Sequence, residues 1–395
     1  MPAILCDFAD INLAARLCFR RPAARRISTA MLQRATPDKT LHVLVATPAA
    51  ATGQGGIDRV MAALKQELAR NGSTRLEVRF GATRGAGHIA LSPFYLAAFM
   101  MRMVAMRTAG RLDLVHINLS SRGSTYRKLQ VARLCRWLGV PYVLHLHSGG
   151  YPDFWTGRPG LLNRRITEMF EGAARIVVLG QTWRRFVASR VPAAAGRIVI
   201  VPNASARPIL PHAGGGDCVH ILYLGRLSDA KGVPQLGDAL HRMRDIPGWR
   251  ATLAGDGDIE MAMAKADELG IAERVELPGW VDSDRVAELI AGADILVLPS
   301  FIENLPLSIV EGMASGLAIV ATPVGAVEDI VHDGKTGLLV PPGDVDALTR
   351  ALTRLVADRE LRLNLGAAAR ELHRERLDLE PYANTVREVW LEACR

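Results

Sequence analysis

Residues 294–321 read DILVLPSFIENLPLSIVEGMASGLAIVA, and this stretch decides the fold class. Two of its runs, 294–298 and 318–321, are apolar apart from Asp294 and have the length and composition of buried strands. The segment between them starts as a loop with two prolines and continues as a helix that Gly316 ends. A strand, a helix and a second strand in this order predict two parallel strands joined by a crossover helix.

Strand-like and helical segments alternate in this way along most of the chain. In the first half, the predicted strands cover 41–46, 114–117, 142–146, 176–179 and 198–201. After a stretch rich in proline and glycine over 203–216, they cover 220–224, 250–254, 275–277, 294–298, 318–321 and 337–340. Two tandem series of βα units predict an α/β protein with two Rossmann-like, doubly wound domains that face a cleft.

The domain boundaries follow from the same pattern. A chain of 395 residues exceeds the ~250–300 residues at which a single core stops growing. We expect a basic extension over 1–40, in which 11–34 form either an amphipathic surface helix or a disordered leader. An N-terminal domain is predicted over 41–209, a C-terminal domain over 210–379, and a last helix over 380–395 that crosses back to the N-terminal domain.

Charge is distributed unevenly between the two halves. The net charge of +8 is the sum of +19 in residues 1–200 and −11 in residues 201–395. A basic half fits an anionic membrane surface, a phosphorylated substrate or nucleic acid, and a solvated basic face is the alternative. The longest apolar stretch, Ile89–Met101, stops at Arg102 and is shorter than the about 20 residues of a membrane-spanning helix. Five scattered cysteines without a CxxC pair favour a reducing cytoplasm.

Two loops that follow predicted strands are suited to phosphate. Gly53–Gly56 joins a strand to a helix, where backbone N–H groups can hold an anion, and a plain tight turn is the alternative. Arg226 and Lys231 follow the strand that ends at Gly225. A guanidinium binds phosphate oxygens in pairs and an ammonium acts as a point charge, so these two side chains suit a diphosphate.

A third loop carries two carboxylates. Glu303 follows the strand 294–298, and Glu311 lies about two turns further along. Asn304 is predicted to cap the helix that Pro306 helps to start, which leaves free N–H groups for an anion. Carboxylates accept hydrogen bonds from paired hydroxyls, so Glu303 and Glu311 can grip two sugar rings. A capping acid and an ordinary helix acid are the alternative.

These motifs resemble those of one family, in the family's own order. They are Val201-Pro-Asn203, Gly225-Arg226…Lys231-Gly232, Gly255-Asp-Gly257, Leu277-Pro-Gly279, Glu303-x7-Glu311 and Thr322-Pro-Val-Gly325. Over most of residues 41–380 the chain resembles the family-four retaining glycosyltransferases of GT-B fold. This resemblance implies an acceptor-binding N-terminal domain and a C-terminal domain that binds a nucleotide-sugar donor.

The resemblance also assigns the donor site. It implies that Arg226 and Lys231 clamp the diphosphate, that Glu303 contacts the donor sugar, and that Glu311 contacts the ribose. The remaining donor-binding residues that it implies are Gly55 and Gly56 in the N-terminal loop, Gly279 and Val281 at the base, and Asn304 and Leu305 after Glu303.

A histidine and a threonine complete the predicted site. His147, in LHLHSGG, resembles the family's active-site histidine and joins Lys231 and Glu303 as a predicted catalytic residue. His145 faces the same side of the strand, and a packed core histidine is the alternative for either. Thr182 opens the next predicted helix, and its resemblance to a small hydroxyl residue of related sequences implies that it approaches the acceptor or a phosphate, with a simple helix N-cap as the alternative.

A finer resemblance suggests the substrates. The segments Gly56-Ile-Asp58-Arg59, His147-Ser-Gly-Gly and Glu303-Asn-Leu-Pro306 look most like bacterial exopolysaccharide α-mannosyltransferases that act on polyprenyl-diphosphate-linked cellobiose. We therefore expect transfer of a hexose, mannose from GDP-mannose, to a polyprenyl-diphosphate-linked oligosaccharide. The alternatives are a UDP-sugar-dependent glycosyltransferase, a nucleotide-sugar epimerase or a phosphorylase of the same fold, and a non-catalytic sugar-binding protein.

No metal and no other cofactor is expected. The three Asp-x-Asp triplets, at 256–258, 282–284 and 344–346, lie at predicted turns or helix starts, where aspartate is favoured in any case. The expected partners are the nucleotide sugar, the lipid-linked saccharide and an anionic membrane surface, with no nucleic acid. We expect the protein in the cytoplasm, peripherally bound to the inner face of the cell membrane.

Overall fold

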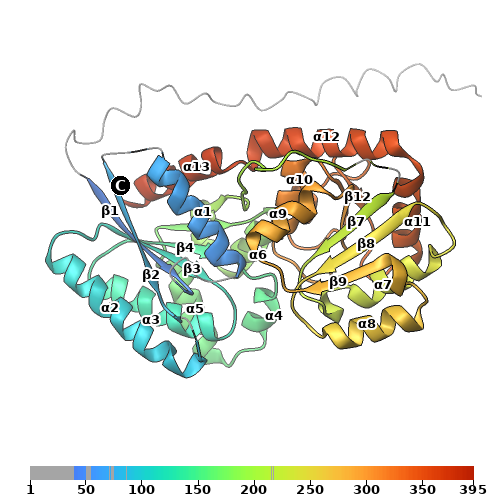
Figure 1. Cartoon of the computed structure of the whole chain (residues 1–395). Coiled ribbons are helices and arrows are strands. Elements are labelled where there is room, and N and C mark those ends of the chain that lie inside the picture. Colours follow the sequence, from blue (N-terminus) through green and yellow to red (C-terminus); the bar gives the residue numbers. More distant parts are fainter. Residues whose placement is uncertain are drawn as a thin grey trace, which may run out of the picture. The chain divides into compact units, whose positions relative to one another are not determined.

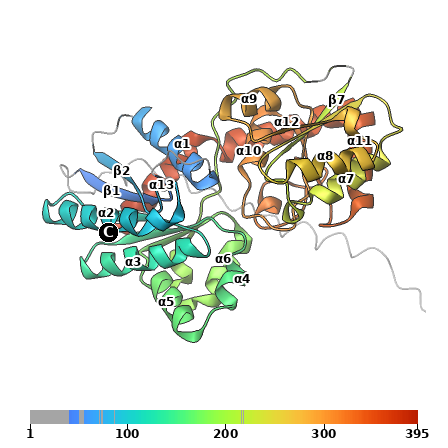
Figure 2. The same cartoon turned by 60° about the horizontal axis from the view of Figure 1, so that its bottom comes forward.

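The computed structural model describes residues 40–49, 55–70, 72, 75–85, 87–214, 216 and 218–395. The predicted basic extension lies outside them, except for Thr40. The described chain forms two six-stranded parallel sheets with helices on both faces of each (Figures 1 and 2). The prediction of an α/β protein with two doubly wound sheets is confirmed.

The first sheet has the strand order β2-β1-β3-β4-β5-β6. Its strands are β1 (Leu41–Thr47), β2 (Leu76–Ala82), β3 (Leu114–Leu119), β4 (Tyr142–Leu146), β5 (Arg175–Val178) and β6 (Ile198–Ile200). One face packs against α1 (Gly56–Arg70) and the last helix, α13 (Leu379–Ala393). The other face packs against α2 (Ser92–Thr108), α3 (Gly123–Trp137), α4 (Tyr151–Thr156), α5 (Gly160–Glu171) and α6 (Gln181–Arg190).

The second sheet has the order β12-β11-β10-β7-β8-β9. Its strands are β7 (Val219–Leu224), β8 (Trp249–Ala254), β9 (Val275–Gly279), β10 (Ile295–Leu298), β11 (Ala318–Ala321) and β12 (Leu338–Leu339). Its helices are α7 (Val233–Arg242), α8 (Ile259–Glu268), α9 (Ser283–Ala291), α10 (Leu307–Ser315), α11 (Val345–Ala357) and α12 (Arg359–Arg376). The central strands are buried along their whole length, as expected for apolar runs covered on both faces.

Strand β2 is absent from the prediction. Its sequence, LEVRFGA, alternates apolar residues with Glu77 and Arg79, and most of it is only half-buried at the edge of the sheet. A search for continuous apolar runs does not find such a strand. The alternation itself is the signal that would have found it.

The carboxyl ends of strands from both sheets border one cleft. Several polar contacts near it join the two halves of the chain, and three of them involve the backbone. The Asn304 amide donates to the Leu146 carbonyl over 3.2 Å, and the Asn203 amide donates to the Leu305 carbonyl over 2.7 Å. The third contact runs from the Gln181 N–H to the Asp329 carboxylate, over 2.6 Å. The cleft is therefore the place where open parallel sheets bind their ligands.

Candidate active site

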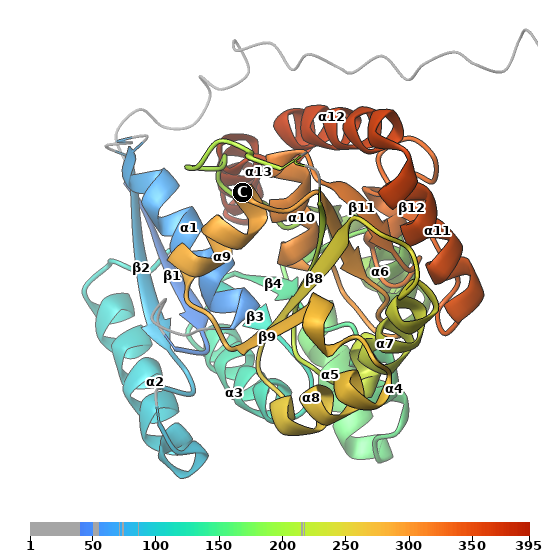
Figure 3. The ribbon, with the colours of Figure 1, turned by 45° about the vertical axis from the view of Figure 1, so that its right-hand side comes forward.

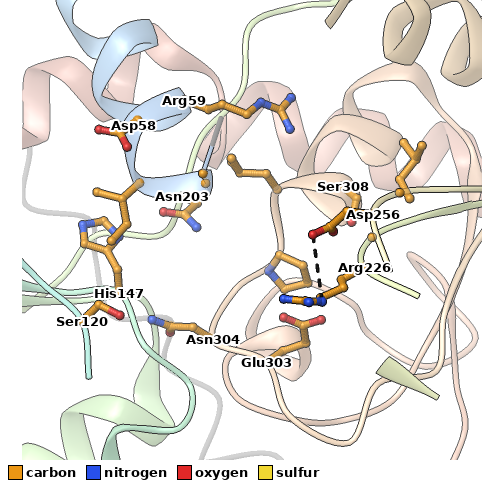
Figure 4. A pocket seen from close by; sticks show the side chains of 18 of the residues that line it. Asp58, Arg59, Ser120, His147, Asn203, Arg226, Asp256, Glu303, Asn304 and Ser308 are labelled. Atoms are coloured by element: carbon orange, nitrogen blue, oxygen red, sulfur yellow. Dashed lines mark ion pairs between the residues drawn. The ribbon is translucent and has the colours of Figure 1, made fainter. Parts of the chain in front are cut away.

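The cleft has a volume of about 1040 Å³ and is lined by residues from both sheets (Figure 4). Nearly all the predicted site residues meet there. Those that line it are Gly55, Gly56, His147, Arg226, Lys231, Val281, Glu303, Asn304, Leu305 and Glu311. This volume is large enough for a nucleotide-sized ligand.

Two predicted residues do not line the cleft. Gly279 ends β9 with φ +74° and turns the chain so that its neighbours Trp280 and Val281 reach the cleft. Thr182 is exposed on α6, with its hydroxyl 3.5 Å from the Arg185 guanidinium. The N-cap of α6 is Gly180, so Thr182 does not cap the helix either.

Lys231 and Glu303 form an ion pair on the wall of the second sheet. Lys231 Nζ donates to Glu303 Oε1 over 2.5 Å, and Ser300 Oγ donates to the same oxygen over 2.9 Å. The Glu303 side chain is 8% exposed and the Lys231 side chain 28%. The described partners of this carboxylate both use Oε1, so Oε2 is available to accept a hydrogen bond from a ligand hydroxyl.

The loop that carries Lys231 depends on glycine. Gly232 has φ +70°, and a Cβ there would lie 2.1 Å from the Pro299 carbonyl oxygen, so the loop can approach β10 only because this residue is glycine. Arg226 leaves the end of β7 with its side chain 67% exposed, 4.0 Å from Asp256 (Figure 4). Its guanidinium therefore faces the cleft with its charge available to an anion.

A second ion pair spans the cleft. Arg59, on α1, contacts Glu311, on α10, and Figure 4 shows the arginine extending from the first helix. Burial raises the pKa of Glu311 and the Arg59 charge lowers it. Sequence reasoning does not assign Arg59 a role of its own, although it stands three residues after Gly56. Its partner carboxylate is the one predicted to hold a ribose.

His147 stands at the cleft end of a buried chain of polar groups. Its Nε2 lies 2.8 Å from Asn118 Oδ1, and the Asn118 amide donates to the Ala46 carbonyl over 3.3 Å. Because an amide oxygen only accepts, the His147 proton is on Nε2 and its Nδ1 is left as an acceptor. Burial and the nearby His116 lower the pKa of His147 to about 3, so the ring is neutral near pH 7.

Behind His147, two more histidines lead to the last helix. The Trp390 indole donates to His116 Nδ1 over 2.9 Å, and His116 Nε2 lies 3.2 Å from His145 Nδ1. The His145 and His147 rings are 3.9 Å apart between centroids. Burial lowers the pKa of His116 to about 4 and that of His145 well below its ordinary value. Helix α13 therefore contacts, through Trp390, the group of neutral histidine rings that lies behind His147.

The predicted capping role of Asn304 is wrong. The N-cap of α10 is Pro306, and no side chain caps this helix. The Asn304 amide instead donates across the cleft to the Leu146 carbonyl, and Asn304 Oδ1 is buried without a partner among the described residues. The free N–H groups of the first turn of α10 still border the cleft, next to Leu307 and Ser308.

One aspartate of each Asp-x-Asp triplet caps a helix, whereas Asp256 lines the cleft beside Arg226. Asp258, Asp282 and Asp344 accept from the N–H groups of Met261, Arg285 and Ala347 and cap α8, α9 and α11. Within the described ranges, no group of three or more histidine, cysteine or acidic residues is placed to hold a metal ion. The positive charge along the described lining of the cleft comes from Arg59, Arg84, Arg226, Lys231 and the start of α10.

Comparison with known proteins finds matches to glycosyltransferases. Residues 218–358 match the family profile "Glycosyl transferases group 1", and residues 26–204 match "Glycosyl transferase 4-like domain". The chain is 29% identical, over 306 residues, to 2-deoxystreptamine N-acetyl-D-glucosaminyltransferase from Streptomyces fradiae. The matched region covers 72% of this chain and 72% of the relative. The chain is 32% identical, over 177 residues, to the lipopolysaccharide core biosynthesis glycosyltransferase LpsE from Rhizobium meliloti, covering 45% of this chain and 49% of the relative.

The fold also has a close structural counterpart. HepE from Anabaena, in complex with UDP-glucose, superposes with a TM-score of 0.69 over 88% of this chain and 98% of its own, at 18% identity. At this identity the likeness concerns the fold.

Proposed function

Because the chain belongs to the group 1 glycosyltransferases and has the GT-B fold, we propose that it is a retaining hexosyltransferase with a nucleoside-diphosphate sugar as donor. The observation that carries this proposal is one cleft that brings Arg226 and Lys231, from the connection between β7 and α7, next to Glu303 and Glu311, from the loop after β10 and from α10. Fixed cations suit a leaving diphosphate, and fixed carboxylates suit sugar hydroxyls.

The main electrostatic problem of the reaction is the charge that develops on the leaving diphosphate. Arg226, Lys231 and the N–H groups at the start of α10 border the cleft on the side of the second sheet. Positive groups that are already in place stabilise this charge without reorganisation. We propose that no metal ion is required, because these groups supply the positive charge.

We propose that the configuration of the anomeric carbon is retained because the acceptor hydroxyl attacks it from the face that the diphosphate leaves. The acceptor hydroxyl oxygen forms a bond to the anomeric carbon while the bond from that carbon to the diphosphate oxygen breaks, and the hydroxyl proton passes to the departing diphosphate. Glu303 is held through Oε1 by Lys231 and Ser300, which suits orientation of the sugar by Oε2. Neutral His147 is proposed to accept a hydrogen bond from the donor sugar through Nδ1.

Two donors are candidates. GDP-mannose is proposed on the resemblance of the His147 and Glu303–Pro306 segments to exopolysaccharide mannosyltransferases. A UDP-linked hexose is the second candidate, supported by the complex of HepE with UDP-glucose. The base is proposed to meet the backbone around Gly279–Val281, which either base can use.

The acceptor is proposed to be a polyprenyl-diphosphate-linked oligosaccharide of exopolysaccharide assembly, at the inner face of the membrane. The net charge of +19 in residues 1–200 supports an anionic, membrane-bound acceptor. The likeness to a lipopolysaccharide core glycosyltransferase supports a lipid-linked saccharide. We propose that the protein is cytoplasmic and peripherally bound.

The test is transfer from a panel of GDP- and UDP-sugars to an isolated lipid-linked glucose disaccharide, scored by mass shift with and without excess EDTA. We expect one hexose to be added from GDP-mannose, equally in both arms. Transfer from a UDP-sugar alone would replace the donor and keep the enzyme class. Loss of transfer in EDTA, restored by Mg²⁺ or Mn²⁺, would contradict metal independence. Conversion of the donor sugar without any acceptor would indicate the epimerase alternative.

Glu303 and Glu311 are expected to affect different kinetic constants. Glu303→Gln should lower kcat, because this carboxylate is proposed to contact the reacting sugar. Glu311→Gln should mainly raise the donor KM, because the ribose does not change during the reaction. Initial rates at varied donor concentration separate the two. Equal losses of kcat with unchanged KM in both variants would contradict these roles.

A further inference from the structure

Helix α2 exposes large apolar side chains to solvent. Phe94 is 73% exposed and Met101 67%. Exposed apolar neighbours on α2 and the short helix Ile89–Leu91 before it are Ile89, Leu91, Tyr95 and Val104. A surface helix of a water-soluble domain normally turns polar residues outward, so this face is suited to a second apolar phase.

The opposite face of α2 holds the helix on the protein. Phe99, Met103 and Met106 are buried, and the Phe99 ring lies against Gly81 of β2. Figures 1 and 3 both show α2 along the outer edge of the first sheet, beside β2 and α3. Since one stripe of the helix belongs to the core, α2 can lie along a membrane surface while the domain stays folded.

The apolar stretch of the sequence stops at Arg102, but helix α2 continues past it to Thr108. The Arg102 guanidinium donates to the Phe80 carbonyl over 3.2 Å. By length and composition alone, Ile89–Thr108 is apolar enough to cross a membrane, with 22% of its apolar window buried in the protein. The packing of α2 on β2 and α3 indicates an in-plane position instead.

The charge around α2 is mainly positive. Arg107 and Arg111 are exposed at its carboxyl end. Between Val78 and Pro152 the sequence has a single acidic residue, Asp113. Its carboxylate accepts a hydrogen bond from the backbone N–H of His42 in β1. Arg79 and, more weakly, Arg111 lower the pKa of Glu77 on β2, and Arg107 has no acidic partner among the described residues. An apolar face next to exposed arginines complements a bilayer whose headgroups are anionic.

A groove on the same side of the sheet also exposes apolar and basic side chains. It lies between α3 and α5, with a volume of about 900 Å³. Trp137, 79% exposed, and Leu161, 65% exposed, line it together with Arg133, Arg165 and one acidic residue, Glu168, which pairs with Arg164. Because α3 packs against both α2 and α5, apolar and basic side chains follow one another along this side of the domain.

We propose that α2 is the membrane-docking element of this protein, with Phe94 and Met101 inserted at the acyl boundary of an anionic bilayer. Arg107 and Arg111 then lie level with the lipid phosphates. The inference deepens the proposed membrane location and rests on that part of the proposed function. A second copy of the chain fits this face less well, because it would bring an equally basic surface against this one.

The test is flotation with vesicles of phosphatidylcholine, with or without phosphatidylglycerol. The variant is Phe94→Ser with Met101→Ser. The matched control is Met261→Ser with Met263→Ser, since these methionines are 62% and 53% exposed on α8. We expect wild type and control to float with anionic vesicles, and the α2 variant to lose on the order of tenfold in bound fraction. Added salt should weaken binding, because it screens the arginines.

Each contrary result has a definite meaning. Equal flotation of the α2 variant and wild type, or no flotation of wild type with anionic vesicles, would overturn the proposal. A wild-type dimer in light scattering that the α2 variant loses, without vesicle binding, would assign the face to a second copy. The thermal shift with GDP-mannose and UDP-glucose is measured in parallel and should be the same in variant and wild type. Vesicle binding without sugar transfer would leave this surface in place and reject the proposed reaction.

Discussion

Lys231→Ala is expected to lower kcat by on the order of a hundredfold or more. Its ammonium is the cation that Glu303 holds at the cleft wall. A charged hydrogen bond is worth ~1.5–3 kcal/mol, and each ~1.4 kcal/mol in the barrier changes the rate tenfold. The variant also leaves the Glu303 carboxylate, 8% exposed, without its cation, which would repel an incoming diphosphate.

The control for this variant is Lys265→Ala. Lys265 is exposed on α8 and pairs with Glu268 away from the cleft, so its loss should leave kcat unchanged. Melting temperatures of both variants separate a loss of catalysis from a loss of stability. The double variant Lys231→Ala, Glu303→Gln lacks the unpaired carboxylate charge, so its melting temperature shows how much of any instability that charge causes. A turnover of Lys231→Ala within about twofold of wild type would reject the proposed diphosphate clamp.

The fold is predictable from the sequence where its signals are local. Each central strand is an apolar run such as 295–298, and each is followed by a turn and a helical spacing, so the alternation identifies both sheets. The motifs that follow these strands also gather at one edge, because the carboxyl ends of parallel strands lie together. Edge strand β2 was missed because solvent on one side permits Glu77 and Arg79 in it.

The contacts that orient the site residues are not local. Arg59 and Glu311 are 252 positions apart, and no spacing in the sequence connects them. Asn118 reads as an ordinary strand residue until the fold sets its amide oxygen 2.8 Å from His147. The sequence around Asn304 and Pro306 predicts that Asn304 caps α10. Its amide instead donates to the carbonyl of Leu146 on the first sheet, a partner that lies far away in the sequence.

Gly149→Ala is expected to reduce kcat by on the order of a hundredfold while leaving the side chains of the site intact. A Cβ on Gly149 would lie 2.3 Å from the Glu303 carbonyl oxygen and 2.9 Å from the Asn304 nitrogen. The same carbonyl is approached from the second sheet by Gly325, whose φ is +65°. The Glu303–Asn304 peptide therefore has no room to retreat, and the added methyl must separate the His147 wall from the Glu303 wall.

The size of the effect follows from how sensitive catalysis is to position. A misplacement of about 1 Å can lower a rate by ~10²-fold, because the reacting groups lose their alignment. Gly150→Ala is the matched control: a Cβ there meets no atom of the described residues within 4 Å, and its φ of −84° suits alanine. The kcat of both variants is compared at saturating donor, with melting temperatures as the check on folding. If Gly149→Ala and Gly150→Ala turn over alike, the spacing across the cleft does not limit the reaction.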